Sequence, residues 1–201
     1  AITDLMNDPF LEMNGMEKLA TIIYTLGEYL RIMVFPHPLT HDYYPYHIPI
    51  MNFGKPGTLI SLALYLGLAY AFFRLWKSKS IYAWSIGFFI ATLSIVSNLV
   101  FPVGSFMNER FIFIPSIAFS LVSAWVLIRH GWNSEKPLFK WGAVALIVLI
   151  SGAYAFKTYT RIPAWKNALS LNGTAAIISP NSARSNCFMA TALYELGRDT
   201  S

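Results

Sequence analysis

The residues best suited to chemistry lie in one short stretch, residues 36–49, which holds three of the four histidines of the chain. Four prolines interrupt it, and proline fixes φ and lacks an N–H donor, so the stretch is predicted to be a loop rather than a helix interior. Imidazole, carboxylate and phenol groups gathered in a loop between apolar segments are typical of a binding or catalytic site. The chemistry-bearing residues, in order, are His37, His41, Asp42, Tyr43, Tyr44, Tyr46 and His47.

Several roles are open for these side chains. His37 and His41 are four residues apart, which on a helix would suit a metal ion, but Pro38 argues against a helix and we assign no metal site. We favour contacts from these histidines to a phosphate or to sugar hydroxyls. Asp42 either braces the loop by hydrogen bonds or acts as a second acid that could hold a divalent metal. Tyr43 either stacks on a sugar or lies among the lipid headgroups, and the second role is favoured.

A second candidate group is Asn108-Glu109-Arg110, and a third is Arg31. Glu109 and Arg110 either form an ion pair at a helix start or leave Arg110 to hold a phosphate, since a guanidinium binds phosphate through two parallel hydrogen bonds. Arg31 lies three residues after Glu28 and therefore on the same helix face. It forms either a local ion pair or a contact with a lipid phosphate.

The composition is that of an integral membrane protein. Hydrophobic residues make up 55% of the 201 residues and charged residues only 12%, against about 25% in a soluble domain. The net charge of +5 comes from dispersed lysines and arginines without a basic stripe, so we expect no nucleic-acid partner.

Residues 1–160 are predicted to form a polytopic α-helical membrane bundle. Four uncharged or nearly uncharged stretches are long enough to span a bilayer, which takes roughly 17 to 25 residues. They lie near 57–76, 81–101, 111–129 and 138–157, and a further spanning or re-entrant helix is predicted near 18–35.

The distribution of lysine and arginine predicts the orientation of the bundle. Cytoplasmic loops carry an excess of these residues, and the turns near 74–79 and 129–140 are the basic ones. The loop at 36–49, the loop at 108–110 and the C-terminal residues are therefore predicted to share the outer side. The basic residues of the two turns are Arg74, Lys77, Lys79, Arg129, Lys136 and Lys140.

Residues 161–201 are predicted to begin a tetratricopeptide-repeat domain. The spacing of Ala168, Ala175 and Pro180 fits the second helix of such a repeat, and Gly197 sits where the repeat places a glycine between helices. Cys187 is predicted to be buried and unreactive on the apolar face of the last helix. Because repeats occur in arrays and the chain has no start methionine, we expect a piece of a longer protein.

The order of the motifs resembles a known family, the transmembrane and tetratricopeptide-repeat-containing O-mannosyltransferases and their bacterial relatives. The resemblance rests on four motifs followed by further spans and repeats. They are Asn7-Asp8-Pro9, Pro38-Leu39-(x)2-Asp42-Tyr43, Ile48-Pro49 and Asn108-Glu109-Arg110-(x)4-Pro115-Ser116.

That family is similar to the C-type membrane glycosyltransferases, and the resemblance implies a function. It implies transfer of a sugar from a polyprenyl-phosphate carrier to an acceptor on the periplasmic or lumenal side, in a bacterial inner membrane or an endoplasmic reticulum membrane. The implied partners are membrane lipid, the carrier, and an acceptor or other protein bound by the repeats. The catalytic aspartate of those enzymes lies in an outer loop with no counterpart here, so the base is expected outside this chain. The alternative function is a non-catalytic membrane scaffold whose repeats recruit a protein.

Overall fold

The computed structural model describes residues 10–41, 43, 47–100 and 103–199. These residues form helices and loops without a strand, so the prediction of an all-α fold is confirmed. Seven α-helices are joined by short 3-10 and π-helical segments. In order, the elements are α1 (Gly15–Val34), α2 (Pro56–Trp76), α3 (Ile81–Ser94), η1 (Glu109–Ile112), α4 (Ser116–Val126), η2 (Leu127–Trp132), α5 (Pro137–Arg161), η3 (Ile162–Trp165), α6 (Ala168–Ile178) and α7 (Ala183–Asp199).

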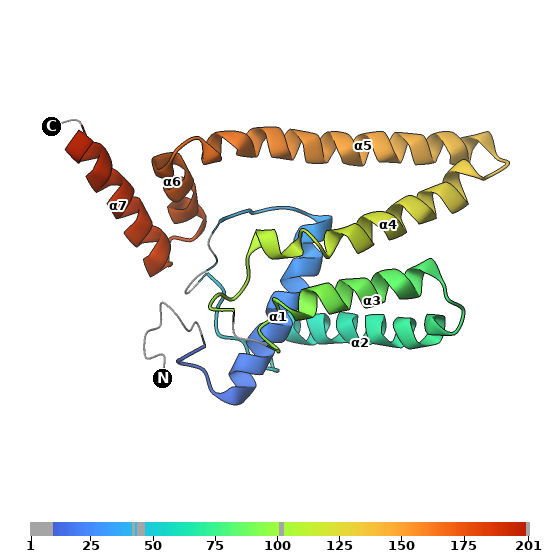
Figure 1. Ribbon diagram of the computed structural model, residues 1–201, viewed down its shortest axis with the longest axis horizontal. Coiled ribbons are helices and arrows are strands. Elements are labelled where there is room, and N and C mark those ends of the chain that lie inside the picture. The colour runs from blue at the N-terminus through green and yellow to red at the C-terminus, as the bar shows by residue number, and fades with distance from the viewer. Residues whose placement is uncertain (1–9, 42, 44–46, 101–102, 200–201) are drawn as a thin grey trace.

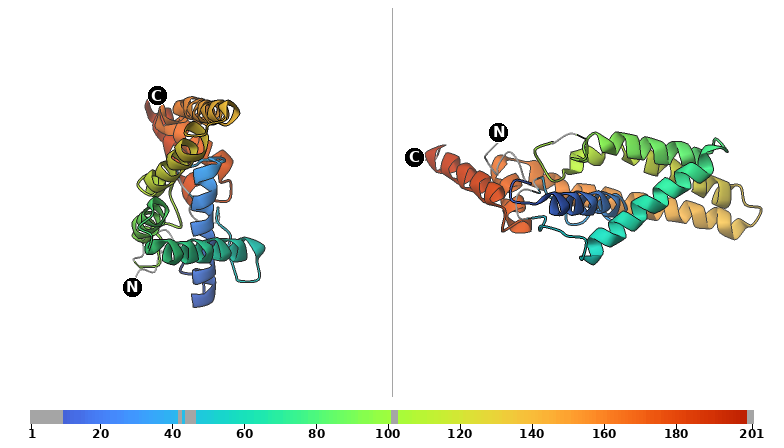
Figure 2. Two further views of the ribbon diagram at one scale, coloured as in Figure 1. Left: turned by 90° about the vertical axis from the view of Figure 1, so that its right-hand side faces the viewer. Right: turned by 90° about the horizontal axis from the view of Figure 1, so that it is seen from below.

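The helices α3, α4 and α5 run roughly along the long axis of the molecule, and α1 lies across them (Figure 1). The view along the long axis shows that α1 also crosses α2 steeply (Figure 2). The α2–α3 turn and the η2–α5 turn lie together at one end, while η1, α6 and α7 lie toward the other (Figure 1). The basic turns and the polar loops are thus at opposite ends of the helices, the arrangement on which the predicted orientation depends.

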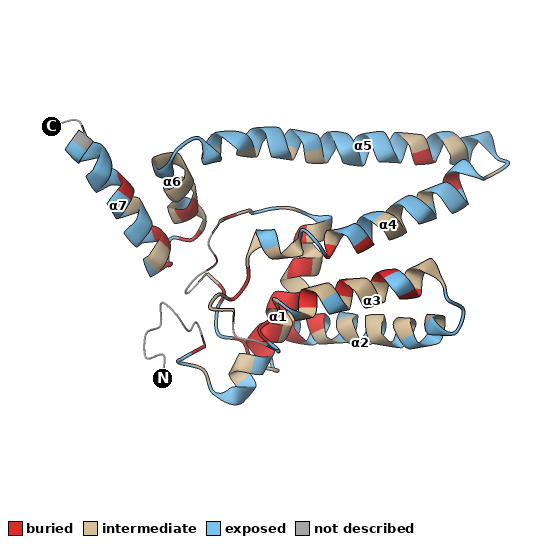
Figure 3. Cartoon of the chain, viewed as in Figure 1, coloured by how far each residue is buried: buried red, intermediate tan, exposed pale blue. Residues whose placement is uncertain are grey.

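The core is centred on α1. This helix begins with a capping box, in which the Asn14 side chain accepts from the Glu17 N–H and the Glu17 carboxylate accepts from the Asn14 N–H. One face of α1 carries Ile22, Leu26 and Tyr29 at helical spacing, and all three are buried. Buried residues are concentrated on α1 and on α3 (Figure 3), and Phe89 and Leu93 of α3 belong to the same buried cluster as the α1 face.

Within the part of the chain that the structure describes, two helices are long and apolar enough to cross a membrane, namely α2 and the continuous helix formed by α5 and η3. Their most apolar stretches have mean hydropathies of 1.6 and 1.7, yet only 11% and 6% of the residues in those stretches are buried. A soluble protein would bury such helices, because apolar surface is unfavourable in water. Exposed apolar helices of this length are suited to contact with lipid.

Two predicted spans differ from the helices observed. The helix that was predicted to reach residue 101 ends at Ser94. The Ser94 and Ser97 hydroxyls bond to backbone carbonyls in this region, and Asn98 adopts a φ of 61°, a conformation that ends helices. The span predicted from residue 111 begins with η1, and α4 starts only after Pro115, which is favoured at a helix start.

The last two helices, α6 and α7, pack against each other. A tetratricopeptide repeat remains a prediction for them, and Gly197 lies inside α7 rather than at its end. The prediction of a buried Cys187 is wrong, because its side chain is exposed. The buried residues at the start of this segment are Ser182 and Ser185. Cys187 follows Ser185 by two positions, roughly 200° around the helix, and therefore faces away from them.

Candidate functional site

The two polar loops that the sequence singled out lie against each other. The Tyr43 hydroxyl donates to Glu109 Oε1 at 3.0 Å, and the Asn108 side-chain amide donates to the His41 carbonyl at 3.3 Å. The backbone N–H of Asn108 also donates to the Tyr29 hydroxyl of α1 at 3.0 Å. Residues from α1, the loop after it and η1 are therefore held together by direct hydrogen bonds.

Glu109 is the carboxylate at the centre of this contact. Burial raises the pKa of its carboxyl, while the Tyr43 hydroxyl and the nearby positive charges of Arg161 and Lys157 act in the opposite direction. Tyr43 is 3% exposed, and burial together with the Glu109 charge raises the pKa of its phenol. Tyr43 therefore keeps its proton and serves as a hydrogen-bond donor to Glu109.

His47 joins this contact to the segment that contains α6 and α7. Its Nδ1 lies 2.7 Å from Oγ of Ser179, which is 1% exposed and follows α6. The His47 ring packs edge-on against Tyr43, with ring centroids 5.0 Å apart. Burial lowers the pKa of His47, which favours the neutral imidazole. A continuous set of contacts thus runs from Ser179 through His47 and Tyr43 to Glu109.

His41 offers a nitrogen without a partner. Its Nδ1 is buried and has no hydrogen bond within the described residues. Burial, followed by the positive charges of Arg161 and Arg184, lowers the pKa of His41. A neutral imidazole with a buried unpaired nitrogen can still bind a polar group that enters its surroundings.

His37 and Arg31 take part in the attachment of α5 to the end of α1. The Lys157 ammonium lies 3.1 Å from His37 Nδ1, and the Arg31 guanidinium donates to the His37 carbonyl. Arg31 also pairs with Glu28, with Nε 2.6 Å from Oε2. The Tyr154 hydroxyl of α5 bonds to the Met33 carbonyl at 3.0 Å.

Arg110, also a predicted site residue, lies apart from the contact between Tyr43 and Glu109. Its side chain is exposed, and its guanidinium carbon lies 5.3 Å from the centroid of the Phe111 ring. Glu28 and Arg31 form an ion pair, whereas the structure, which describes both Glu109 and Arg110, shows no ion pair between those two. Asp42 lies outside the described residues.

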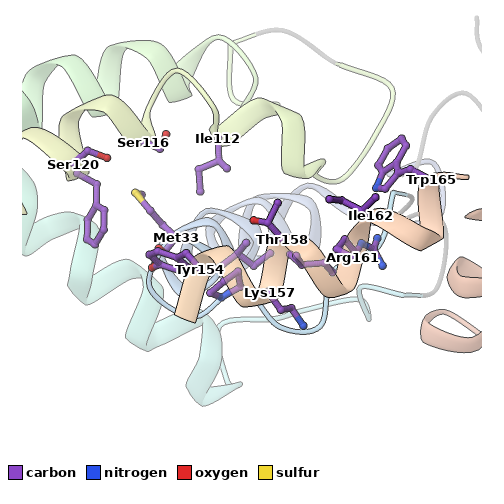
Figure 4. A pocket seen from close by; sticks show the side chains of 14 residues that line it. Met33, Ile112, Ser116, Ser120, Tyr154, Lys157, Thr158, Arg161, Ile162 and Trp165 are labelled. Atoms are coloured by element: carbon purple, nitrogen blue, oxygen red, sulfur yellow. The ribbon is translucent and has the colours of Figure 1, made fainter. Parts of the chain in front are cut away.

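A cavity of about 460 Å³ opens beside these loops, between the end of α1, the start of α4 and the end of α5. We call it the cationic cavity, because Lys157 and Arg161 line its α5 wall (Figure 4). Hydroxyl groups of Ser116, Ser120 and Thr158 supply further polar atoms. The apolar part of the lining is Ile32, Met33, Pro36, Leu39, Ile112, Phe119, Ile162 and Trp165.

The cationic cavity continues into an apolar groove of about 850 Å³, the α4–α5 groove. The two share Pro36, Phe119, Ser120, Tyr154 and Lys157. The groove wall consists mainly of aliphatic and aromatic side chains of α4 and α5. An apolar groove that ends at two cations has the polarity expected for binding an amphiphile with an anionic head.

The sequence prediction missed Lys157 and Arg161. They are four residues apart at the end of a predicted span, so they share one face of α5 at the end that carries the polar loops. That spacing was the available signal. No cluster of three or more His, Cys, Asp or Glu side chains suited to a metal ion occurs in the described part of the chain.

Comparisons with known proteins give three distant relatives. The chain is 32% identical over 93 residues to protein O-mannosyl-transferase TMTC3 of Homo sapiens and, equally, to that of Mus musculus. It is 28% identical over 134 residues to protein O-mannosyl-transferase Tmtc1 of Drosophila melanogaster. These matches cover 44% and 61% of this chain, but only 9% and 15% of the relatives. No model of a protein family and no solved structure matches.

Proposed function

We propose that this chain is part of an integral-membrane glycosyltransferase that moves a sugar from a polyprenyl-phosphate carrier to an acceptor on the outer side of the membrane. The names of the relatives support a glycosyltransferase-like function. The exposed apolar surface of α2 and α5 supports a membrane location. The observation that carries the proposal is the cationic cavity at the end of the α4–α5 groove.

In this proposal Lys157 and Arg161 bind the carrier phosphate. Both line the cavity from one face of α5, and a phosphate beside such cations accepts charge-assisted hydrogen bonds. The α4–α5 groove holds the isoprenoid chain, whose apolar surface matches its lining. Arg110 does not line this cavity. The proposal therefore assigns the phosphate to Lys157 and Arg161 instead of to Arg110.

The polar contact formed by Tyr43 and Glu109 is proposed to position the loops beside the sugar end of the carrier. Arg161 lies near Glu109 and also lines the cavity, so the two features are adjacent. His41, with its unpaired Nδ1, is proposed to contact a sugar hydroxyl or a phosphate oxygen. The resemblance places the catalytic aspartate in an outer loop that has no counterpart in these residues, so we assign these groups to binding and orientation.

The test is the affinity of the full-length protein, in nanodiscs, for polyprenyl-phosphate mannose and for the matching polyprenol without phosphate. Arg161→Gln and Lys157→Gln should each weaken binding of the phosphate-bearing ligand about ten- to a hundredfold, because a charge-assisted hydrogen bond is worth roughly 1.5–3 kcal/mol and 1.4 kcal/mol is tenfold.

Binding of the polyprenol should be the same in both variants and in the wild type. Arg110→Gln is the matched control and should retain the wild-type affinity, since its side chain is exposed outside the cavity. A folded double variant of Lys157 and Arg161 that binds the phosphate-bearing ligand as tightly as the wild type would refute the proposal.

One observation favours the alternative of a membrane-anchored scaffold. The last two helices expose large apolar side chains, with Ile177 82%, Tyr194 73% and Leu193 50% exposed. Exposed apolar surface of this kind is typical of protein interaction sites. On this reading the Lys157 and Arg161 variants leave partner binding intact, whereas Tyr194→Ser and Ile177→Ser weaken it.

A further inference from the structure

A second groove, of about 1060 Å³, runs between α1 and α2, and nothing in the proposed carrier site uses it. We call it the α1–α2 groove. Val34, Phe35 and Phe119 line both this groove and the α4–α5 groove, so the last turn of α1 separates the two. The α2 wall is apolar, and its Ile60 and Leu64 are 60% and 49% exposed.

Two glycines show how the space between α1 and α2 changes along this groove. At the crossing of α1 and α2, a Cβ on Gly27 would lie 1.9 Å from Ser61 Oγ, so only glycine allows the helices to approach this closely. Farther along α2, a Cβ on Gly67 would meet no atom within 4 Å. The helices are thus in tight contact at the crossing and leave open space along the groove toward Gly67.

A charged pair lies at the edge of this apolar groove. Glu28 and Arg31 both line it, and their side chains are 18% and 39% exposed. Charged groups at membrane depth are unfavourable unless they face each other, a polar ligand or the headgroup layer. The Arg31 guanidinium also donates to the carbonyl of His37 in the polar loop after α1, so the pair lies beside that loop, at the end of the groove where headgroups are expected.

We infer that the α1–α2 groove binds a zwitterionic phospholipid. An acyl chain lies along Ile60, Leu64 and Gly67, the headgroup ammonium faces the Glu28 carboxylate, and the phosphate faces the Arg31 guanidinium. The phosphate of an anionic phospholipid could also face Arg31, but its headgroup has no ammonium to face the Glu28 carboxylate. The pairing of opposite charges therefore selects a zwitterion. The inference shares with the proposed function the membrane location and the three side chains between the two grooves, but it assigns a different ligand to a different groove.

The experiment is native mass spectrometry of the full-length protein titrated with phosphatidylethanolamine and with phosphatidylglycerol of the same acyl chains. The wild type should bind phosphatidylethanolamine about tenfold more tightly or better. Gly67→Leu should reduce this binding at least tenfold, because the new side chain fills open space in the groove. Gly142→Leu is the matched control, since Gly142 also has open space around it but lies outside the described grooves.

Two further variants test the headgroup contacts. Glu28→Gln should remove most of the preference for phosphatidylethanolamine, and Arg31→Gln should weaken binding of both lipids. Equal affinity of the wild type for the two lipids, or undiminished binding by Gly67→Leu, would overturn the inference. Carrier affinity is measured on the same samples. If the wild type binds the carrier but does not prefer phosphatidylethanolamine, this inference alone is refuted. If it prefers phosphatidylethanolamine but its carrier binding does not depend on the phosphate, the proposed function alone is refuted.

Discussion

Replacing Tyr43 with phenylalanine removes the hydroxyl that donates to Glu109 and keeps the aromatic ring. The ring stays against His47, and the hydroxyl is lost from a side chain that is only 3% exposed. The Glu109 oxygen, 3.0 Å away in the wild type, then has no phenol to accept from. The loss of stability should depend on whether Glu109 is ionised.

The magnitude follows from the charge on the acceptor. A hydrogen bond between neutral groups contributes about 0.5–1.5 kcal/mol, and one to a charged group about 1.5–3 kcal/mol. A change of 1 kcal/mol shifts the melting temperature of a protein of this size by roughly 2–4 °C. We therefore expect Tyr43→Phe to lower the melting temperature by about 3–12 °C at pH 8 and by about 1–6 °C at pH 4.

The direction with pH follows from the shifted pKa of Glu109. Burial raises this pKa, so between the ordinary carboxyl pKa and the raised one the folded protein holds more protons than the unfolded chain, and stability falls as pH rises. The Tyr43 hydroxyl lowers the same pKa. Removal of the hydroxyl therefore raises the pKa of Glu109 further. The pH range in which stability falls then extends to higher pH, so the variant loses more stability than the wild type at high pH.

The assay is thermal melting of the detergent-solubilised protein at pH 4 and pH 8, repeated in a Glu109→Gln background. Glutamine accepts a hydrogen bond without titrating, so the effect of Tyr43→Phe should there be the same at both pH values. An equal loss at both pH values with Glu109 present, or a pH-dependent loss in the Glu109→Gln background, would show that the phenol does not act through the carboxylate.

Three other changes test separate contacts. Gly131→Ala places a Cβ about 2.2 Å from the Ala143 Cβ and should destabilise the η2–α5 turn by roughly 1–3 kcal/mol, while Gly142→Ala, with open space around it, should be neutral or slightly stabilising in thermal melts. Ser179→Ala removes the hydroxyl beside His47 and should increase hydrogen exchange in α6 and in the loop containing His47 while leaving the α2–α3 turn unchanged. Cys187 is exposed and should react readily with a membrane-impermeant maleimide in the purified native protein; protection equal to that of a buried thiol would contradict the structure.

The helical fold could be predicted because it depends on composition and segment length. Uncharged stretches of this length have few structural alternatives, and α2 coincides almost residue for residue with the predicted span at 57–76. The early end of α3 was harder to predict. It follows from local side-chain bonds to the backbone and from the positive φ of Asn98, which a count of apolar residues does not register.

The candidate site was predictable only in part. A loop rich in histidine and proline pointed to residues 36–49, and the structure brings His41 and Tyr43 from it into contact with Asn108 and Glu109. The side chain that pairs with Glu109 was not predictable, because sequence neighbours suggested Arg110 whereas the fold supplies Tyr43, 66 residues away. Contacts between residues this far apart in the sequence depend on how the helices cross, and a local sequence pattern does not predict the crossing.

The transverse α1 also implies an order of assembly during synthesis. Three of its hydrogen bonds to later parts of the chain join residues 39, 79 and 121 positions apart, from Leu26 to Tyr65, from Tyr29 to Asn108 and from Met33 to Tyr154. At roughly 5–20 residues per second, the last of these partners emerges about 6 to 24 s after its counterpart in α1. The nascent helix therefore meets α2 first, η1 next and α5 last. The wall of the cationic cavity that α5 supplies is accordingly the final part of the membrane bundle to close.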